Sequence, residues 1–428
     1  MMMFLGILVL LVMLVFGMPV AFALGIAGMA GLFTIGGLPM VEGVLRTVAL
    51  STTSSYELLT IPMFILMAEF IIVSRIADEL FDCAATWIGR TPAGLAISTA
   101  IAGAGFGAIS GSSTASAATL SATTIPAMLR NNYNPRFAAG VVAISGPLAM
   151  LIPPSIALIL YGLIADISVS KLLIAGIVPG VLVTCVIILT SLLLVFLFPN
   201  FAPAGRAYTM AEKFRSLKIV GPMVVLISLV TGCIYLGIAT PTESASLGAF
   251  GAMCIALARK RLSVESFYMA MRKAAATSCM IVMIIICAHI FSYYFTLTGV
   301  TQNLVALVAG LKVDSWMILT LIIMLYLVLG CFMDQIAILF LTVPITLPII
   351  LALGYDPFWF GVVVIITAEI GLVTPPIGLN VFVVSAYSDV KVKDIFIGVS
   401  PHVVAHLFII ALLAIFPAIV TWLPESVR

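Results

Sequence analysis

Residues 145–155 read Ser-Gly-Pro-Leu-Ala-Met-Leu-Ile-Pro-Pro-Ser, and residues 367–380 read Thr-Ala-Glu-Ile-Gly-Leu-Val-Thr-Pro-Pro-Ile-Gly-Leu-Asn. The two double prolines, Pro153-Pro154 and Pro375-Pro376, are 222 residues apart. Proline has no backbone N–H, and within a helix it leaves the carbonyl group four residues earlier without its usual partner. Each stretch therefore predicts a helix that is broken inside an apolar segment.

The same offset of 222 residues relates other positions along the chain. The matched positions are Pro19 and Pro241, Pro126 and Pro348, Tyr133-Asn134-Pro135 and Tyr355-Asp356-Pro357, Lys171 and Lys393, Gly176 and Gly398, and Pro179 and Pro401. So many matches in one register, without a gap, predict two halves of common design. We place the halves at residues 1–198 and 220–428, joined by a polar linker at 199–219.

The composition indicates that lipid surrounds most of this chain. Of its 428 residues, 63% are hydrophobic and 8% are charged, with a mean hydropathy of +1.30, whereas soluble domains carry about 25% charged residues. This predicts an all-α integral membrane protein, because a helix crosses the hydrocarbon core with roughly 20 apolar residues. The net charge of +2 gives no reason to expect nucleic acid as a partner. The seven cysteines form no Cys-x-x-Cys pair, so neither a metal centre nor a disulfide framework is predicted.

Each half contains two short apolar pieces around a tip that is rich in glycine or polar residues. We predict that residues 93–129 and 316–353 form re-entrant hairpins, which enter and leave the membrane on one side. Each half then crosses the membrane five times. Because five is odd, the second half must be inverted relative to the first, which is the plan of many secondary transporters.

The basic residues orient this topology. Fifteen of the 19 Lys and Arg residues fall on one side, and the other four are Arg46, Lys171, Lys312 and Arg428. By the positive-inside rule the first side is cytoplasmic. Both termini are then expected outside, the first hairpin enters from the cytoplasm, and the second enters from the outside.

Polar residues at membrane depth gather at the two tips and the two breaks. The tips are residues 110–116, rich in Ser and Gly, and residues 329–335, which include the carboxylate of Asp334. An intramembrane carboxylate is expensive to leave unpaired, and non-helical backbone is tolerated at this depth where it lines a cavity. Close helix packing and simple proline kinks would explain any one of these segments. Their recurrence at matched positions favours a transport site, where carbonyl and hydroxyl oxygens bind a cation and helix N-termini attract an anion.

Three stretches resemble one known family. They are Gly107–Ser116, the phrase Gly237-Ile-Ala-Thr-Pro-Thr-Glu243-Ser-Ala-Ser, and the paired Ile-Pro-Pro and Thr-Pro-Pro breaks. Over essentially the whole chain the sequence is similar to the large membrane subunit of tripartite ATP-independent periplasmic (TRAP) transporters. The resemblance implies a scaffold domain and an elevator-type transport domain that carries both hairpins. It also implies uptake of a small organic acid across the bacterial inner membrane, driven by a sodium gradient, and no Walker motif is present.

The resemblance further implies partners and ligands. The expected partners are a small four-helix membrane subunit, expected here as a separate chain, and a soluble periplasmic substrate-binding protein. Sodium ions are the expected coupling ions, with no organic cofactor. By position, one sodium site would use Ser110, Ser113, Ser145, Gly146 and Pro147, and a second would use Gly330, Thr367, Gly371 and Thr374. The organic anion would lie between the tips, near Ser112, Ser113, Asp334, Gln335 and Asn380.

Three other functions compete with this interpretation. A self-sufficient sodium/dicarboxylate symporter would have a similar fold, and dependence on a binding protein distinguishes the two. A membrane-embedded hydrolase needs a nucleophile with a base or a metal, yet no histidine stands near Ser110–Ser116 and no His-Glu-x-x-His motif occurs. We therefore expect no enzymatic activity. A channel is disfavoured because hairpins that enter from opposite sides suit alternating access better than a continuous pore.

Overall fold

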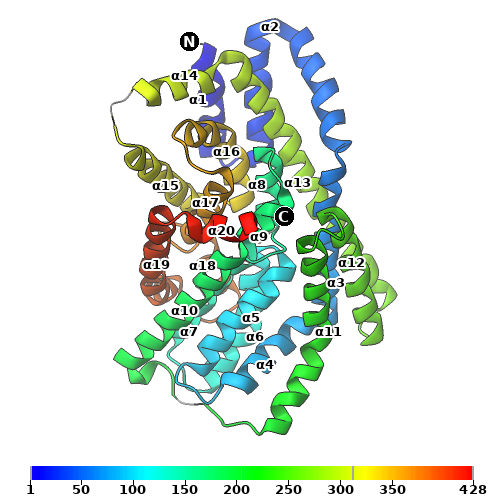
Figure 1. Ribbon diagram of the computed structural model, residues 1–428, viewed down its shortest axis with the longest axis vertical. Coiled ribbons are helices and arrows are strands. Elements are labelled where there is room, and N and C mark those ends of the chain that lie inside the picture. The colour runs from blue at the N-terminus through cyan, green and yellow to red at the C-terminus, as the bar shows by residue number, and fades with distance from the viewer. Residues whose placement is uncertain (1, 204, 311–312, 427–428) are drawn as a thin grey trace.

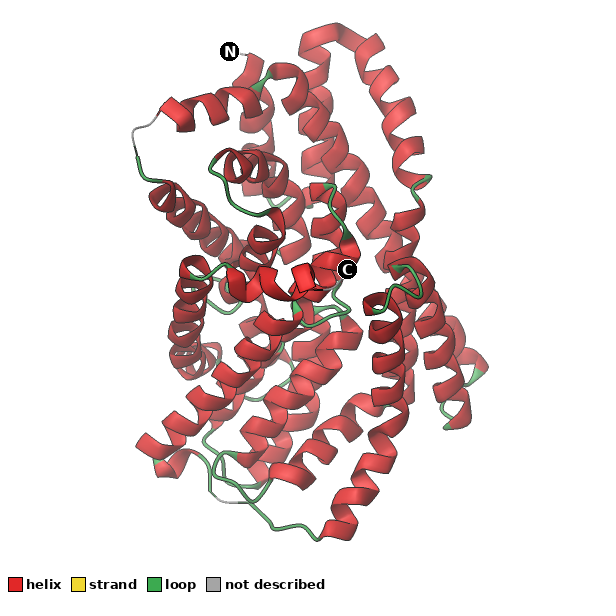
Figure 2. Cartoon of the chain, viewed as in Figure 1, coloured by secondary structure: helices red, strands yellow, loops and turns green. Residues whose placement is uncertain are grey.

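The computed structural model describes residues 2–203, 205–310 and 313–426. Within these residues the ordered elements are helices and no strand occurs (Figure 2). Eight of the described helical segments are long and apolar enough to cross a membrane. The prediction of an all-α integral membrane protein is confirmed. Lys312 and Arg428, two of the basic residues used to orient the chain, lie outside the described residues.

The described part of the first half, together with the start of the linker, contains ten α-helices and three short 3-10 helices. They are α1 (Met2–Val15), α2 (Val20–Thr53), η1 (Tyr56–Leu59), α3 (Thr60–Ser74), α4 (Ile76–Ile88), α5 (Gly94–Ser110), α6 (Ser113–Arg130), α7 (Pro135–Ser145), η2 (Pro147–Met150), α8 (Ile156–Ala165), α9 (Val169–Ala175), α10 (Ile177–Leu197) and η3 (Pro199–Phe201). The described part of the second half contains α11 (Met210–Tyr235), α12 (Pro241–Ala258), α13 (Val264–Thr298), α14 (Val300–Gly310), α15 (Ser315–Phe332), α16 (Gln335–Ala352), α17 (Pro357–Gly371), α18 (Leu379–Ala386), α19 (Val392–Ile415) and α20 (Ala418–Ser426).

Helix starts recur at the offset of 222 residues, and the sequence explains why. Helix α7 begins at Pro135 and α17 at Pro357. The N–H of Arg136 donates to Asn134 Oδ1 at 2.9 Å, and the N–H of Trp359 donates to Asp356 Oδ1 at 2.8 Å. A capping side chain followed by proline at the first helical position is a strong start signal. The matched Tyr-Asn-Pro and Tyr-Asp-Pro triplets are therefore two copies of one helix start.

One boundary differs from the prediction. Helix α11 begins at Met210, so the second part of the predicted linker 199–219 is helical. Helix α2 runs to Thr53 with a bend at Gly36 and Gly37, the latter at a φ of +64°.

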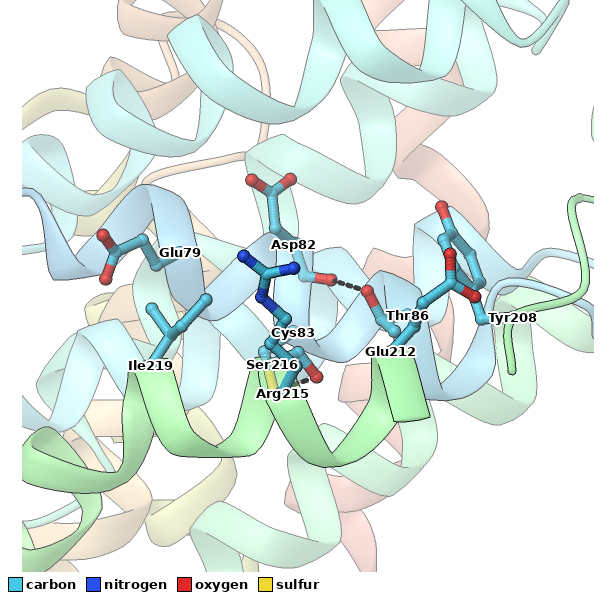
Figure 3. A pocket seen from close by; sticks show the side chains of 9 residues that line it. All are labelled: Glu79, Asp82, Cys83, Thr86, Tyr208, Glu212, Arg215, Ser216 and Ile219. Carbon is cyan, nitrogen blue, oxygen red and sulfur yellow. Dashed lines mark hydrogen bonds between the residues drawn. The ribbon is translucent and has the colours of Figure 1, made fainter. Parts of the chain in front are cut away.

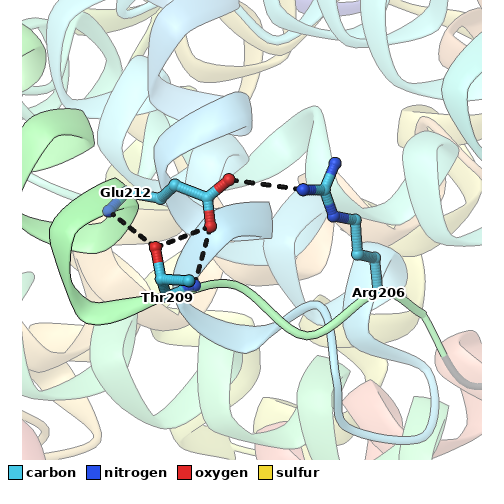
Figure 4. A network of polar contacts seen from close by, with 3 residues as sticks. All are labelled: Arg206, Thr209 and Glu212. Atoms are coloured by element: carbon cyan, nitrogen blue, oxygen red, sulfur yellow. Dashed lines mark hydrogen bonds and ion pairs between the residues drawn. The ribbon is translucent and has the colours of Figure 1, made fainter.

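A capping box starts α11 (Figure 4). The backbone N–H of Thr209 donates to Glu212 Oε2 at 2.7 Å, and the N–H of Glu212 donates to Thr209 Oγ1 at 3.3 Å. Arg206 adds an ion pair to Glu212 at 3.4 Å. The Thr-x-x-Glu spacing was the available signal for this start. It was missed because the polar residues around it resemble a linker.

The helices form two groups, as Figure 1 shows. Helices α2, α3, α11, α12 and α13 pack on one another along one side of the molecule, and we call them the scaffold group. Both hairpins, α5–α6 and α15–α16, pack with α7, α8, α10, α17, α18 and α19, and we call these helices the hairpin group. Helix α4 packs on both α11 and α5, and helix α14 on both α13 and α16. These two helices connect the groups.

A polar junction fixes α4 to the scaffold group. Arg259, at the end of α12, forms an ion pair with Glu79 of α4 and donates to the carbonyl of Ile219 on α11. A cavity of about 310 Å³ lies between α4 and α11, and the side chain of Arg215 extends from α11 toward α4 beside Asp82 (Figure 3). This cavity is lined by α4, α11 and Tyr208, not by the hairpin tips, so it is not the predicted transport site.

Candidate functional site

The first hairpin turns sharply at its tip. Helix α5 ends at Ser110, and Gly111 adopts a φ of +54°, which a residue with a side chain rarely adopts. Ser112 then caps α6, because the N–H of Ala115 donates to its Oγ at 3.4 Å. The hydroxyls of Ser110 and Ser116 lie 2.7 Å apart and are buried. The tip is therefore held by its own serines.

The second hairpin uses different side chains for the same turn. Asp334 caps α16, with the N–H of Ile336 donating to Oδ2 at 3.1 Å. Its matched residue Ser112 caps α6, so both positions have one structural role. Gln335 is fully buried and donates from Nε2 to the carbonyl of Ile365 at 3.3 Å. The Asp334 carboxylate is thus directed at a helix N-terminus, which favours a negative charge.

Both helix breaks lie where the double prolines predicted them. In the first half α7 ends at Ser145, η2 follows, and Ser155 caps α8 by accepting from the N–H of Leu158 at 3.2 Å. In the second half α17 ends at Gly371 and α18 begins at Leu379. The peptide bonds Pro153-Pro154 and Pro375-Pro376 are both cis. The sequence did not predict this isomer.

The backbone of each hairpin approaches the break of its own half closely. A Cβ atom on Gly107 of α5 would lie 2.6 Å from the Cα of Ala149 in the first break. A Cβ atom on Gly371 would lie 2.4 Å from the Cα of Gly330. The structure therefore brings together Gly330 and Gly371, two residues of the second predicted sodium set. The N–H of Gly378 also donates to the carbonyl of Cys331 at 3.2 Å, which ties the second break to the hairpin tip.

The two halves meet at one contact between a tip and a break. Nδ2 of Asn380, in the second break, donates to Oγ of Ser113, the first residue of α6, at 2.5 Å. Both side chains are buried. Helix α6 packs on α18, and its counterpart α16 packs on α8, so each hairpin contacts the helix that follows the break of the other half. Ser113 and Asn380, both predicted to contact the substrate, are brought together.

Several predicted sodium ligands have hydroxyls that bond to their own helix. Ser145, Thr367 and Thr374 each donate to the carbonyl four residues earlier, at 2.7, 2.7 and 2.6 Å. Such back-bonding is common for hydroxyls inside helices. Gly146 and Pro147 lie in the transition from α7 to η2 and are buried. The hydroxyl hydrogens of these three residues are therefore already donated. Their oxygen atoms can still accept a hydrogen bond or contact a cation.

Buried oxygen atoms without a hydrogen-bond partner cluster on these segments. They are Oε1 of Gln335, Oδ1 of Asn380 and Oε1 of Glu369. Carbonyl, amide and carboxylate oxygens are the ligands that hard cations take. Among the described residues no group of three or more His, Cys, Asp or Glu side chains could hold a metal ion. These segments therefore offer buried oxygen atoms as possible ligands.

Three residues of the site were quoted from the sequence without a role. Ser116, which pairs with Ser110, was quoted within the tip without a role, and Gly378, at a φ of +62°, was not assigned one. Glu369 was quoted within the break and was also left unassigned. Its signal was a carboxylate inside an otherwise apolar run.

The two breaks differ in exposure. Pro153 and Pro154 are buried, whereas Pro375 and Pro376 are exposed. The exposed pair borders a cavity of about 530 Å³ whose other lining residues include Lys393, Phe396 and Ser400. An open approach with one cationic side chain therefore leads to the second break.

Known proteins resemble this chain along nearly its whole length. Residues 7–419 match the family described as the tripartite ATP-independent periplasmic transporter, DctM component. The isethionate TRAP transporter permease protein DctMQ of Oleidesulfovibrio alaskensis is 34% identical over 95% of this chain, which spans 64% of that protein's length. The C4-dicarboxylate TRAP transporter large permease protein DctM of Pseudomonas aeruginosa is 32% identical over 93% of each chain.

A solved transporter structure shares the fold. The YdaH transporter of Alcanivorax borkumensis aligns with a TM-score of 0.68 over 91% of this chain and 90% of its own, at 14% sequence identity. That likeness supports the membrane-transporter fold, and the family match supports the assignment. The chain belongs to the DctM family, the large permease component of tripartite ATP-independent periplasmic transporters.

Proposed function

We propose that this permease imports a small organic anion together with sodium ions, by moving its hairpin group past its scaffold group. The observation that carries the proposal is the hydrogen bond between Ser113 and Asn380. It joins a hairpin tip of one half to a helix break of the other. Sites at the interface of two repeats, formed by discontinuous helices, are typical of secondary transporters.

Two helix N-termini support an anionic substrate. Ser113 is the first residue of α6 and Asn380 is the second residue of α18, so the hydrogen bond between them brings both N-termini to one place. Helix N-termini favour negative charge and offer unpaired N–H groups. Isethionate and C4-dicarboxylates, named for two relatives, are both small organic anions. We therefore place the anion beside Ser112, Ser113 and Asn380, with Asp334 and Gln335 at the opposing tip.

The proposed coupling ions occupy the two breaks. The first sodium site comprises Ser110, Ser113, Ser145, Gly146 and Pro147, and the second comprises Gly330, Thr367, Gly371 and Thr374. Pro147 leaves the carbonyl of Ala143 without a helical donor. The contact of Gly330 with Gly371 supports the second set, because it closes one hairpin arm directly on the break.

Cavities along the seam between the two groups support the proposed motion. Two of them, of about 240 and 220 Å³, are lined from both groups, and both are lined by His289 of the scaffold group and Phe340 of the hairpin group. A third, of about 200 Å³, lies between the scaffold group and α9, and Glu57 lines it as well as the first. A loosely packed seam lets one rigid group slide against another more easily than a close-packed interior would.

The proposal includes two partners and a location. We assign a soluble periplasmic binding protein that delivers the anion, and a small four-helix membrane subunit. The tripartite description of the family supports both, and the relative named DctMQ extends beyond the part that matches this chain. We place the complex in the bacterial inner membrane with both termini of this chain in the periplasm, as the charge distribution favours.

Uptake into proteoliposomes tests the proposal. Vesicles that hold the permease and its small subunit are given labelled organic anions, with or without an inward sodium gradient and with or without the binding protein. Uptake that requires both the gradient and the binding protein is expected. Uptake that ignores the binding protein would support a self-sufficient symporter, and uptake that ignores sodium would contradict the coupling.

A further inference from the structure

Glu369 is a buried carboxylate for which the proposed function gives no role. It lies on α17, two residues before the helix ends, and its side chain is 4% exposed. Its Oε1 atom has no hydrogen-bond partner. An ionised carboxylate in such a place is strongly disfavoured unless a cation or several donors offset its charge.

No basic side chain of the described residues offsets this charge. Among the described residues the ion pairs join Arg136 to Asp394, Arg206 to Glu212 and Arg259 to Glu79, and none involves Glu369. A permanently unpaired charge would lower the stability of the hairpin group considerably. The carboxylate must therefore carry a proton or be balanced by a bound cation.

A second buried oxygen lies at the same turn of α17. The amide of Gln335 donates to the carbonyl of Ile365 at 3.3 Å. In an α-helix that carbonyl also receives the N–H of the residue four positions later, which is Glu369. The Gln335 side chain therefore reaches α17 at the turn that carries Glu369. Its Oε1 atom is buried and also lacks a partner.

This pair of oxygens is separate from the second proposed sodium set. A helix has about 3.6 residues per turn, so side chains two residues apart point in directions that differ by roughly 200°. Thr367 and Glu369 therefore leave α17 on opposite faces. The Gly330 contact closes the hairpin nearby, since a Cβ on Gly330 would lie 2.8 Å from the carbonyl oxygen of Ala368.

We propose that the Glu369 carboxylate and Gln335 Oε1 bind an additional sodium ion between α17 and the tip of the second hairpin. The inference rests on the proposed function and adds one carboxylate-bound cation to it. The negative charge of Glu369 balances the ion, so the hairpin group crosses the membrane without the net charge of a bare cation. Hard oxygen ligands and a carboxylate are the chemistry that selects such an ion over softer metals.

The substitution Glu369→Gln tests the charge while keeping the shape. In purified permease with its small subunit, equilibrium binding of radioactive sodium is expected to fall by one ion per permease. In proteoliposomes, the sodium concentration for half-maximal uptake is expected to rise more than tenfold. The control is Glu69→Gln, which changes a partly buried carboxylate on α3 of the scaffold group. It should leave the number of bound sodium ions and the half-maximal sodium concentration unchanged.

Unchanged sodium binding in Glu369→Gln would overturn the proposal, because glutamine mimics a carboxylic acid that always carries a proton. A second variant, Gln335→Leu, removes the amide oxygen without altering Glu369, and its thermal unfolding reports whether it folds. Weaker sodium binding is expected in Gln335→Leu, and sodium binding as strong as in the wild type would also overturn the proposal. If the wild-type permease itself ignores sodium, the proposed function fails. If the wild-type permease depends on sodium and both Glu369→Gln and Gln335→Leu bind sodium as it does, this inference fails and the proposed function stands.

Discussion

Nδ2 of Asn380 lies 2.5 Å from Oγ of Ser113, although 267 residues separate them in the sequence. This bond joins the second half of the chain to the first at a buried position. Oδ1 of Asn380 is also buried and has no partner, so the amide presents one committed group and one free acceptor. The geometry suits a residue that holds the site together and also contacts a ligand.

The bond between Asn380 and Ser113 should be measurable as a coupling energy. We expect Asn380→Ala and Ser113→Ala to destabilise the protein by less in combination than the sum of the two single effects, with a coupling of about 1 kcal/mol. Thermal or denaturant unfolding of the four forms gives the value. In the control cycle Ser121→Ala replaces Ser113→Ala, because the Ser121 hydroxyl donates to the carbonyl of Ala117 in its own helix. Additive effects are expected there.

The contact between Gly330 and Gly371 should tolerate no side chain. A Cβ on Gly371 would lie 2.4 Å from the Cα of Gly330, so Gly371→Ala must separate the hairpin from the break. Overpacking of this kind costs about 1–3 kcal/mol. We expect reduced stability and loss of uptake. Gly232→Ala is the matched control, because nothing lies within 4 Å of the added atom on α11, and wild-type stability in Gly371→Ala would contradict the packing.

Sodium dependence should be lost when the second break is filled. Thr374 stands directly before Pro375 and Pro376, and its hydroxyl donates to the carbonyl of Ile370 at 2.6 Å. Thr374→Leu replaces the oxygen with a bulky apolar group. We expect membrane insertion to continue and sodium-dependent uptake to disappear, with Ser113→Leu giving the same result in the first half. Wild-type sodium dependence in both variants would remove these residues from the proposed ion sites.

The junction at Arg259 should contribute to stability without contacting the site. Its guanidinium pairs with Glu79 and with the carbonyl of Ile219, and both charged side chains are largely shielded. Removing one partner of a shielded pair leaves the other charge unbalanced. We expect Arg259→Gln to lower the temperature of thermal unfolding clearly, and Arg261→Gln, exposed two residues later, to leave it unchanged. Equal unfolding temperatures for the two variants would show that the pair is inconsequential.

The sequence by itself determined the class of the molecule and the segments that matter. Low charge and long apolar runs predict helices in a membrane, because no soluble core could bury them. The double prolines predict the breaks, and the Tyr-Asn-Pro and Tyr-Asp-Pro triplets mark the helix starts at Pro135 and Pro357. These features are local: each depends on the backbone chemistry of a few neighbouring residues. One local signal was missed: the Thr-x-x-Glu capping box that begins at Thr209 starts α11 inside the predicted linker.

Only the tertiary structure decided which residues of the two halves meet. The sequence named both Ser113 and Asn380, yet nothing local pairs residues 267 positions apart. It placed the anion near Asp334, and the fold adds that this carboxylate caps the N-terminus of its own helix. It passed over Glu369, whose importance comes from burial and from the Gln335 amide at the same turn. Burial and pairing arise from how whole helices pack, and packing is a property of the entire chain.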